Sequence, residues 1–400
     1  MKILHISYSD KVGGGASIAA LRLHKGFLKR GYTSNFWCIK KITEDKNILC
    51  IYNYFGSKFN SIKNKLNQLF FKILNKDSNQ SFSFNIWPSR LAKKINASDF
   101  DVIILHWINA ETMSCKDIAN IKKPVVWVVH DLWPILGIKH YDQSAYIQDN
   151  LFIQKFEIFF KDYKLKQWKN FNPYIVTVGS WLKNEIKSSE FFKNSEVYTI
   201  SNTLDLNKFK PKDKKESKKI FNLPIDKKII LFGAYDIEDK RKGGDLLVDA
   251  LMYLDTSLQK SITIVCFGNG SFNIDNFQCI NLGIIDDQNR LVSLYSSADI
   301  MCVPSRLETF GQTASEALAC GIPVVAFDTT GLKDIVQHKK TGYLATAYDA
   351  KDFSTGIEWI ISQTDNDIPL KSLSRKRAKN QFSEEIIINE YINIFEKICK

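Results

Sequence analysis

The sequence predicts an α/β protein made of two Rossmann-like domains with parallel sheets. Short β-branched runs alternate with amphipathic stretches, and 400 residues suffice for two domains. The runs form two series: Lys2–Ser7, Val102–His106, Val125–His130, Tyr174–Val178 and Glu196–Ile200, then Lys228–Phe232, Ile262–Phe267, Gln278–Leu282, Ile300–Val303 and Pro323–Phe327.

The two series change over at a stretch rich in lysine, residues 201–218, which is typical of a linker. We therefore expect one domain over residues 1–202 and a second over 203–380, with ligands bound in the crevice at the carboxyl ends of the strands. Residues 381–400 begin with Ser383 as a helix-capping residue and then carry apolar residues at helical spacing, which predicts one last helix.

Composition excludes several classes of protein. Hydrophobic residues at 44% and charged residues at 24% are typical of folded soluble proteins and argue against disorder and coiled coil. The 8 cysteines show neither paired spacing nor histidine neighbours, which predicts reduced thiols without a disulfide framework or structural zinc. The first ten residues lack an apolar signal core and no apolar run is long enough to span a membrane, so we expect a cytoplasmic protein.

The net charge of +12 comes from the first half of the chain, since residues 1–200 carry +13 and residues 201–400 carry −1. This asymmetry favours an anionic partner for the first half, and a lysine-rich surface in water is the alternative. Nucleic acid is not expected, because zinc-finger spacing, RNP-type motifs and arginine-rich segments are missing from the sequence.

Residues 54–76 predict an amphipathic helix with one apolar face, five lysines and no acidic residue. A second basic and aromatic stretch covers residues 155–169. The two stretches favour peripheral contact with an anionic membrane surface. The alternative is a helix packed on its own domain with its lysines in water.

The loop that follows the run Ile300–Val303 carries Glu308 and Gly311 and leads into a helix from Gln312. The free N–H groups at the start of a helix bind anions, and carboxylates accept hydrogen bonds from vicinal hydroxyls. We expect Glu308 and Glu316 to face one pocket for a phosphorylated sugar or nucleotide. For an isolated pair, a capping glutamate and a solvated one are the alternative.

Residues 298–342 resemble the donor-site signature of retaining glycosyltransferases of family 4, which have the GT-B fold. The E-x7-E pair, Ala-Cys-Gly-Ile-Pro-Val-Val-Ala, Thr-Gly-Leu and Lys-Thr-Gly-Tyr-Leu occur in the family's order. The resemblance implies Glu308 near the hydroxyls of the donor sugar, Glu316 on the ribose, and the donor phosphates on the backbone of Phe310, Gly311, Gln312 and Thr313.

The loop 232–244 continues the resemblance. Lys242 matches the family lysine that grips the donor diphosphate, whereas Ala234 stands in place of the family arginine. The resemblance therefore leaves Arg241, Lys240 or a helix N-terminus to bind the donor diphosphate in place of that arginine. An Asp-x-Asp metal set is missing beside these motifs, so we expect neither a metal nor a cofactor.

The glycine loop 13–15 departs from the dinucleotide pattern G-x-G-x-x-G, so an NAD site is not expected. The resemblance implies instead that the backbone of Gly14 and Gly15 approaches the donor phosphate or the acceptor. It also implies that His130 lies beside the donor sugar, whereas His106 is expected to be an ordinary satisfied polar group.

The run from His130 to Tyr141 resembles a subgroup of bacterial surface-polysaccharide transferases, although Gly137-Ile-Lys stands where that subgroup has Gly-Gly-Cys. The resemblance implies retaining transfer from a nucleotide-diphosphate sugar to a hydroxyl of a glycan or polyprenyl-diphosphate-linked acceptor. His130, Glu308 and Lys242 would be catalytic, and the last helix would pack on the first domain. Alternatives are an epimerase or phosphorylase on the same fold and a non-catalytic membrane-associated binding protein.

Overall fold

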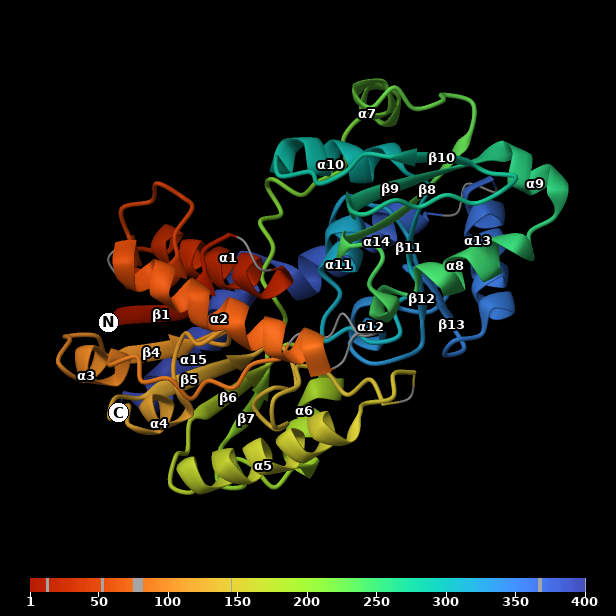
Figure 1. Cartoon of the computed structure of the whole chain (residues 1–400). Helices are drawn as coiled ribbons and strands as arrows, with labels where there is room; N and C mark the ends of the chain where they lie inside the picture. The colour runs from red at the N-terminus through yellow and green to blue at the C-terminus, as the bar shows by residue number, and fades with distance from the viewer. Residues whose placement is uncertain (12–13, 52–53, 75–81, 145, 366–368, 400) are drawn as a thin grey trace. The chain divides into compact units, whose positions relative to one another are not determined.

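The computed structural model describes residues 1–11, 14–51, 54–74, 82–144, 146–365 and 369–399 (Figure 1). The chain divides into two compact units. Unit 1 comprises Met1–Thr203 and Ile387–Lys400, and unit 2 comprises Leu204–Ile386. Each unit contains one parallel sheet with helices, so the predicted α/β fold class is confirmed.

The sheet of unit 1 has the strand order β3-β2-β1-β4-β5-β6-β7, and every pair is parallel. The central strands are buried on both faces, which explains their continuous apolar sequences. The bounds are β1 Lys2–Ser9, β2 Thr33–Lys40, β3 Ile48–Cys50, β4 Val102–Leu105, β5 Val125–Val129, β6 Tyr174–Thr177 and β7 Val197–Thr199.

The sheet of unit 2 has the order β10-β9-β8-β11-β12-β13 and is also parallel. Its main core packs the sheet against the buried faces of α8 (Gly244–Met252) and α13 (Ala350–Asp365). The strands are β8 Lys228–Asp236, β9 Ile262–Asn269, β10 Gln278–Asn281, β11 Ile300–Val303, β12 Val324–Phe327 and β13 Gly342–Ala345.

The sequence prediction missed three strands, β2, β3 and β13. β2 mixes polar and apolar residues, and β3 has only three residues, so neither gives a clear pattern. β13 opens with Gly342, and a Cβ there would lie 1.9 Å from the Val324 carbonyl oxygen. The close approach of β12 therefore requires glycine, which weakens the sequence signal for a strand.

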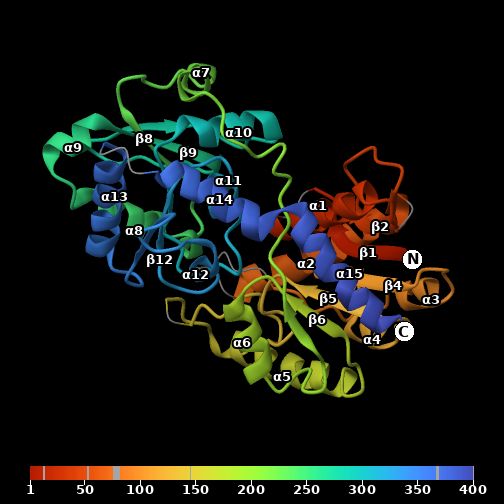
Figure 2. The ribbon, with the colours of Figure 1, turned by 180° about the vertical axis from the view of Figure 1, so that it is seen from behind.

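The helix predicted within residues 381–400 is present as α15, and a further helix, α14, precedes it. α14 (Leu370–Phe382) stops before Ser383, which is extended, and α15 (Glu384–Ile398) follows it. From Ile387 onward α15 lies in unit 1 (Figure 2). There Phe395 stacks on Phe27 of α1 (Gly15–Lys29) at 5.5 Å between ring centroids.

The remaining helices lie mostly between successive strands, as expected for a parallel sheet. Among the described helices, none combines the length and the hydropathy that a membrane-spanning segment needs. Their bounds are α2 Tyr54–Leu74, α3 Leu91–Asn96, α4 Cys115–Ala119, α5 Leu151–Gln167, α6 Ser180–Ser188, α7 Lys214–Ile220, α9 Thr256–Ser261, α10 Gln288–Ser297, α11 Gln312–Ala319 and α12 Leu332–Ile335.

Candidate functional site

Both sheets have a point where the strand order reverses. β1 lies between β2 and β4, and β8 lies between β9 and β11. In open parallel sheets, ligands bind outside the carboxyl ends of the strands at such a point. The predicted residues follow these strands: Gly14 follows β1, Lys242 follows β8, and Glu308 follows β11, while His130 follows β5, the neighbour of β4.

In unit 2, Lys242 and Glu308 form an ion pair between the loops after β8 and β11. The Lys242 ammonium donates to Glu308 Oε1, and the side chains are 18% and 13% exposed. Ser305 Oγ donates to the same oxygen at 3.2 Å. Burial would raise the pKa of Glu308, but the charges of Lys242 and Arg241 outweigh burial and hold this pKa below its ordinary value. Glu308 is therefore an ionised carboxylate at neutral pH.

The backbone brings these two loops together. Gly243 has φ +71, and a Cβ there would lie 2.0 Å from the Pro304 carbonyl oxygen, so only glycine fits this approach. The Arg306 N–H donates to the Arg241 carbonyl at 2.9 Å, which ties the loops a second time. Lys242 thus sits in a 3-10 turn, Lys240–Lys242, that is fixed against the end of β11.

Arg241 and Lys240 were the two predicted substitutes for the family arginine at Ala234. The Arg241 guanidinium donates to Asp239 at 3.0 Å and to the Leu307 carbonyl at 3.2 Å, so it braces the two loops. Lys240 is exposed, and Ala234 is buried in β8. Which of the two cations meets a diphosphate stays a prediction.

Three helices at the reversal points begin behind a glycine and have no capping side chain. They are α1 behind Gly14, α8 behind Gly243 and α11 behind Gly311. Serine, asparagine or aspartate side chains cap α4, α5, α7, α9 and α10, whereas α6 and α12 also begin behind a glycine without a capping side chain. Helix starts whose cap residue supplies no side-chain acceptor suit an external anion.

Glu316 lies in the second turn of α11 and is buried. The Tyr295 hydroxyl donates to its Oε2 at 2.9 Å. Glu308 has other partners, Lys242 and Ser305. That the two carboxylates face one pocket stays a prediction. The role of Glu316 on a ribose stays a prediction, as do the backbone roles of residues 310–313.

In unit 1, a buried polar cluster follows β4 and β5. Asp131 accepts hydrogen bonds from Trp107 Nε1 at 2.8 Å and from His140 Nδ1 at 2.7 Å. Burial opposes ionisation of Asp131, but His140 and the other donors outweigh burial and keep the pKa of Asp131 below its ordinary value. His140 therefore holds the 131–140 loop from within, and this loop positions the chain just after His130.

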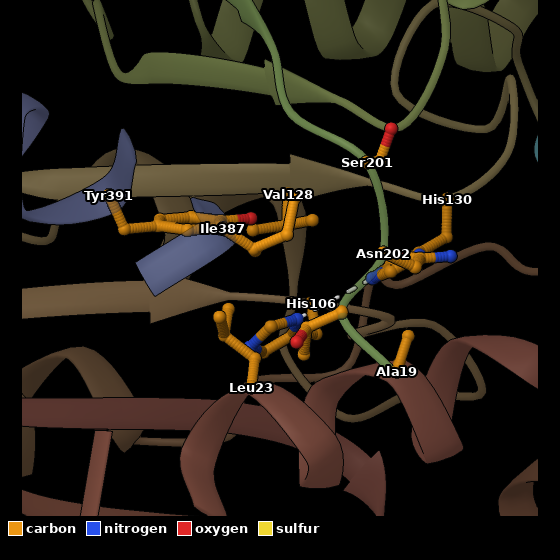
Figure 3. Close-up of a pocket in the computed structure, with 10 residues that line it drawn as sticks. Ala19, Leu23, His106, Val128, His130, Ser201, Asn202, Ile387 and Tyr391 are labelled. Carbon is orange, nitrogen blue, oxygen red and sulfur yellow. Dashed lines mark hydrogen bonds between the residues drawn. The ribbon is translucent and has the colours of Figure 1, made fainter. Parts of the chain in front are cut away.

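His130 lines a small pocket within unit 1 together with Ser201 and Asn202 (Figure 3). His106 lies beside His130, and the distance between His106 Nδ1 and His130 Nε2 is 3.4 Å. The sequence reasoning missed His5, whose Nδ1 lies 3.0 Å from His106 Nε2. A histidine inside the buried apolar run of β1 was the available signal. In the predicted glycine loop, Gly14 is the N-cap of α1 and Gly15 is its first residue, while Gly13 lies outside the described residues.

A metal requirement was not expected from the sequence. Within the part of the chain that the structure describes, no three His, Cys, Asp or Glu side chains are grouped so that they could hold a metal ion. That the chemistry needs no metal stays a prediction.

Comparison with known proteins finds its family match in unit 2. Residues 213–381 match the family model described as "Glycosyl transferases group 1". The chain is 31% identical over 182 residues to D-inositol 3-phosphate glycosyltransferase 2 of Catenulispora acidiphila, covering 41% of this chain and 42% of the relative. It is 24% identical over 240 residues to the capsular polysaccharide biosynthesis glycosyltransferase CapM of Staphylococcus aureus, covering 56% and 62%. The chain thus spans about half the length of the curated relatives it matches.

Solved structures match along the whole chain. Anabaena HepE in complex with UDP-glucose has a TM-score of 0.66 at 16% identity, covering 99% of this chain and 100% of that one. At this identity the match concerns the fold. The chain therefore has the fold of the GT-B glycosyltransferases, and the glycosyl transferases group 1 model matches the part of it that carries Lys242 and Glu308.

Proposed function

We propose that the protein is a glycosyltransferase that moves a sugar from a nucleotide-diphosphate sugar to a hydroxyl of a glycan or lipid-linked acceptor. The observation that supports this most is the Lys242–Glu308 pair between the starts of α8 and α11. A cation and two helix N-termini suit a diphosphate, and an ionised carboxylate suits sugar hydroxyls.

In this proposal, the leaving diphosphate is stabilised by Lys242 and by the helix N–H groups of α8 and α11. Glu308 orients both the donor sugar and Lys242, because the two side chains are already paired. Glu316, whose Oε2 accepts from the Tyr295 hydroxyl, would hold the ribose. No metal step is needed, because these groups supply the positive charge.

Donor binding is the first test. Isothermal titration with UDP, GDP and ADP compares the bases, and UDP comes first because the similar HepE structure contains UDP-glucose. We expect one nucleoside diphosphate to bind at micromolar concentration, and binding should be weaker in Lys242→Met. If none of the nucleotides binds, the donor site is wrong.

Turnover separates the competing activities. Incubation with the nucleotide sugar and an acceptor hydroxyl should give the glycoside and free nucleoside diphosphate. Isomerised donor without acceptor would indicate an epimerase, phosphate-dependent cleavage a phosphorylase, and binding without turnover a binding protein. We further propose retention at the anomeric carbon, which proton NMR of the product reads directly; an inverted product contradicts it.

We also propose that unit 1 docks on an anionic membrane surface, as expected for an enzyme of bacterial surface-polysaccharide synthesis. CapM is a relative from such a pathway by its name. α2 supports docking because its apolar side faces water. Exposed fractions are 42 to 59% for Phe59, Ile62, Leu66, Leu69 and Phe70.

The polar side of α2 is the side that faces unit 1. Asn67 donates to Glu111 at 3.0 Å and Gln68 donates to the Phe82 carbonyl at 3.0 Å, while buried Asn60 donates to the Ala110 carbonyl at 3.3 Å. α2 therefore packs on unit 1 through its polar side, with Lys58 and Lys65 exposed as in the predicted alternative, and its apolar side is left for the proposed docking. A continuous exposed apolar surface marks an interaction site.

α5 extends this surface. The ring of Phe156 on α5 contacts Phe70 of α2 at 5.8 Å between centroids. Four further apolar residues of α5 are 61 to 71% exposed, namely Leu151, Phe152, Ile158 and Phe159. We call these residues and the exposed ones of α2 the α2–α5 surface. Lys58, Lys65 and Lys155 are exposed on the same helices, so anionic lipid complements the surface in charge.

Vesicle flotation tests the docking. We expect the protein to float with phosphatidylglycerol vesicles and not with phosphatidylcholine vesicles, and Ile62→Glu should weaken flotation at least tenfold. Ile220→Glu is the matched control, because Ile62 and Ile220 are both 53% exposed and Ile220 lies on α7 of unit 2. Equal flotation with neutral vesicles, or a dimer that Ile62→Glu dissociates, would contradict the proposal.

A further inference from the structure

Three histidines form a hydrogen-bonded row through the sheet of unit 1. His5 lies in β1, His106 directly follows β4, and His130 directly follows β5; these strands are neighbours in the sheet. His5 Nδ1 is 3.0 Å from His106 Nε2, and His106 Nδ1 is 3.4 Å from His130 Nε2. The row ends at the pocket in which Figure 3 places His106 and His130.

All three rings are held rigidly. The planes of His5 and His106 differ by 8° and those of His106 and His130 by 26°, so the rings are nearly parallel along the row. Exposure is 0% for His5, 2% for His106 and 9% for His130, which makes His130 the end nearest to solvent.

The rings are neutral at physiological pH. Burial lowers the pKa of His130 to about 4 and lowers the pKa values of His5 and His106 well below the usual range. A neutral imidazole carries one N–H and one lone pair. His106 must therefore donate from one nitrogen and accept at the other, so both hydrogen bonds of the row point the same way.

The far end of the row decides the direction. His5 Nε2 is buried and has no hydrogen-bond partner among the described residues. If the row ran from His130 to His5, this nitrogen would carry a buried N–H without an acceptor, the costlier and rarer kind of orphan. With the opposite direction, Nε2 keeps only a lone pair, and Nδ1–H of His5 donates to His106.

We propose that His5 and His106 are positioning residues that fix His130 as the tautomer with its proton on Nδ1. His106 Nδ1–H then donates to His130 Nε2, so the lone pair of His130 is occupied. His130 offers a hydrogen-bond donor to an oxygen, such as that of a sugar hydroxyl, and not a general base. The identity of that oxygen rests on the proposed function, whereas the tautomer does not.

The tautomers can be read without any substrate. Two-bond proton–nitrogen correlation spectra of the full chain, labelled with 15N-histidine, distinguish Nδ1–H from Nε2–H rings. His338 is an internal reference, because its Nδ1 accepts from the Leu344 N–H at 3.1 Å and its proton must be on Nε2. We expect Nδ1–H signals for His5, His106 and His130 in the wild type. An Nε2–H or doubly protonated His130 at pH 7 overturns the proposal.

Two amide substitutions of His106 test its role. In His106→Asn the amide takes the place of Nδ1 and can still donate to His130; in His106→Gln the amide takes the place of Nε2 and reaches only toward His5. We expect His130 to keep its Nδ1 proton in the asparagine variant and to lose that preference in the glutamine variant. An unchanged His130 signal in the glutamine variant would overturn the positioning role of His106.

Activity adds a separate readout. We expect kcat to fall about tenfold in His106→Gln with little change in the KM of the donor, the effect of one lost neutral hydrogen bond, and His106→Asn should recover most of it. Should the spectra agree while no transfer activity exists, the proposed function fails and the tautomer stands. If His106→Gln does not fold, the wild-type spectrum still decides the direction of the row.

Discussion

Replacing Lys242 by methionine removes the cation of the Lys242–Glu308 pair and keeps much of the side-chain volume. Glu308 would then be a largely buried carboxylate that keeps the hydrogen bond from Ser305 and has lost its cation. We expect two effects: lower stability of unit 2, and a kcat about 100-fold to 1,000-fold lower because the leaving diphosphate loses a positive group.

The size of the stability effect follows from burial. Removing one partner of a buried pair costs about 3–5 kcal/mol, and the 18% and 13% exposure of these side chains favours the lower end, about 3 kcal/mol. The double variant Lys242→Met/Glu308→Gln leaves no unpaired charge, so it should cost about 2 kcal/mol less than the sum of the single variants.

The effect also depends on pH with a definite sign. The folded pKa of Glu308 lies below the ordinary 4.5, so the pair stabilises the fold above that pH and its contribution is lost as the pH falls through the lowered value. The difference between the wild type and Lys242→Met should therefore shrink with acidification until the pH passes below the lowered pKa of Glu308 in the wild type.

Urea unfolding measures these differences, and the transition that UDP shifts identifies unit 2. Asp245→Asn is the control, because Asp245 is 60% exposed in its pair with Arg306 and should cost under about 1 kcal/mol. A coupling energy below about 0.5 kcal/mol in the double-mutant cycle would refute the pair as a stabilising unit.

Three further predictions concern other residues. Glu316→Gln should raise the Kd for UDP about tenfold in calorimetry, more than Tyr295→Phe, which keeps the carboxylate charge. Gly311→Ala should lower the unfolding midpoint more than Gly14→Ala, because both have φ +93 but only at Gly311 would a Cβ meet an atom, Leu332 Cδ2 at 2.8 Å. Burial lowers the pKa of Lys164 to about 7, so the free energy of unfolding of the wild type should rise by up to about 1.4 kcal/mol per pH unit between pH 7 and 10.5. Lys164→Met should abolish this slope in urea titrations carried out over that pH range.

The motifs of unit 2 could be predicted from the sequence because each is local. β11, the loop with Glu308 and the start of α11 at Gln312 lie within one stretch of the chain, and turn residues mark their ends. Even so, spacing along the chain could not tell that Lys242 pairs with Glu308, 66 residues away. That contact depends on the reversal of strand order between β8 and β11.

Unit 1 was harder to predict for a physical reason. The pattern of residues 54–76 predicted an amphipathic helix, but periodicity cannot tell which face turns inward. Its polar face is the buried one because Ala110 and Phe82 offer carbonyls and Glu111 a carboxylate to α2. In the same way, His5 looked like part of an ordinary strand, since its partner His106 lies 101 residues further along the chain.

The net charge of the first half does not belong to the reversal point of its sheet. The residues gathered there are neutral histidines, whereas the lysines of α2 and α5 are largely at the surface. In unit 2 the near-neutral half instead places the cations Lys242 and Arg241 directly at its reversal point. A diphosphate needs local positive charge and a sugar hydroxyl needs only a directed donor. The reversal point of unit 2 therefore suits a diphosphate and that of unit 1 suits a hydroxyl, while the surplus charge of unit 1 remains for a partner at the α2–α5 surface.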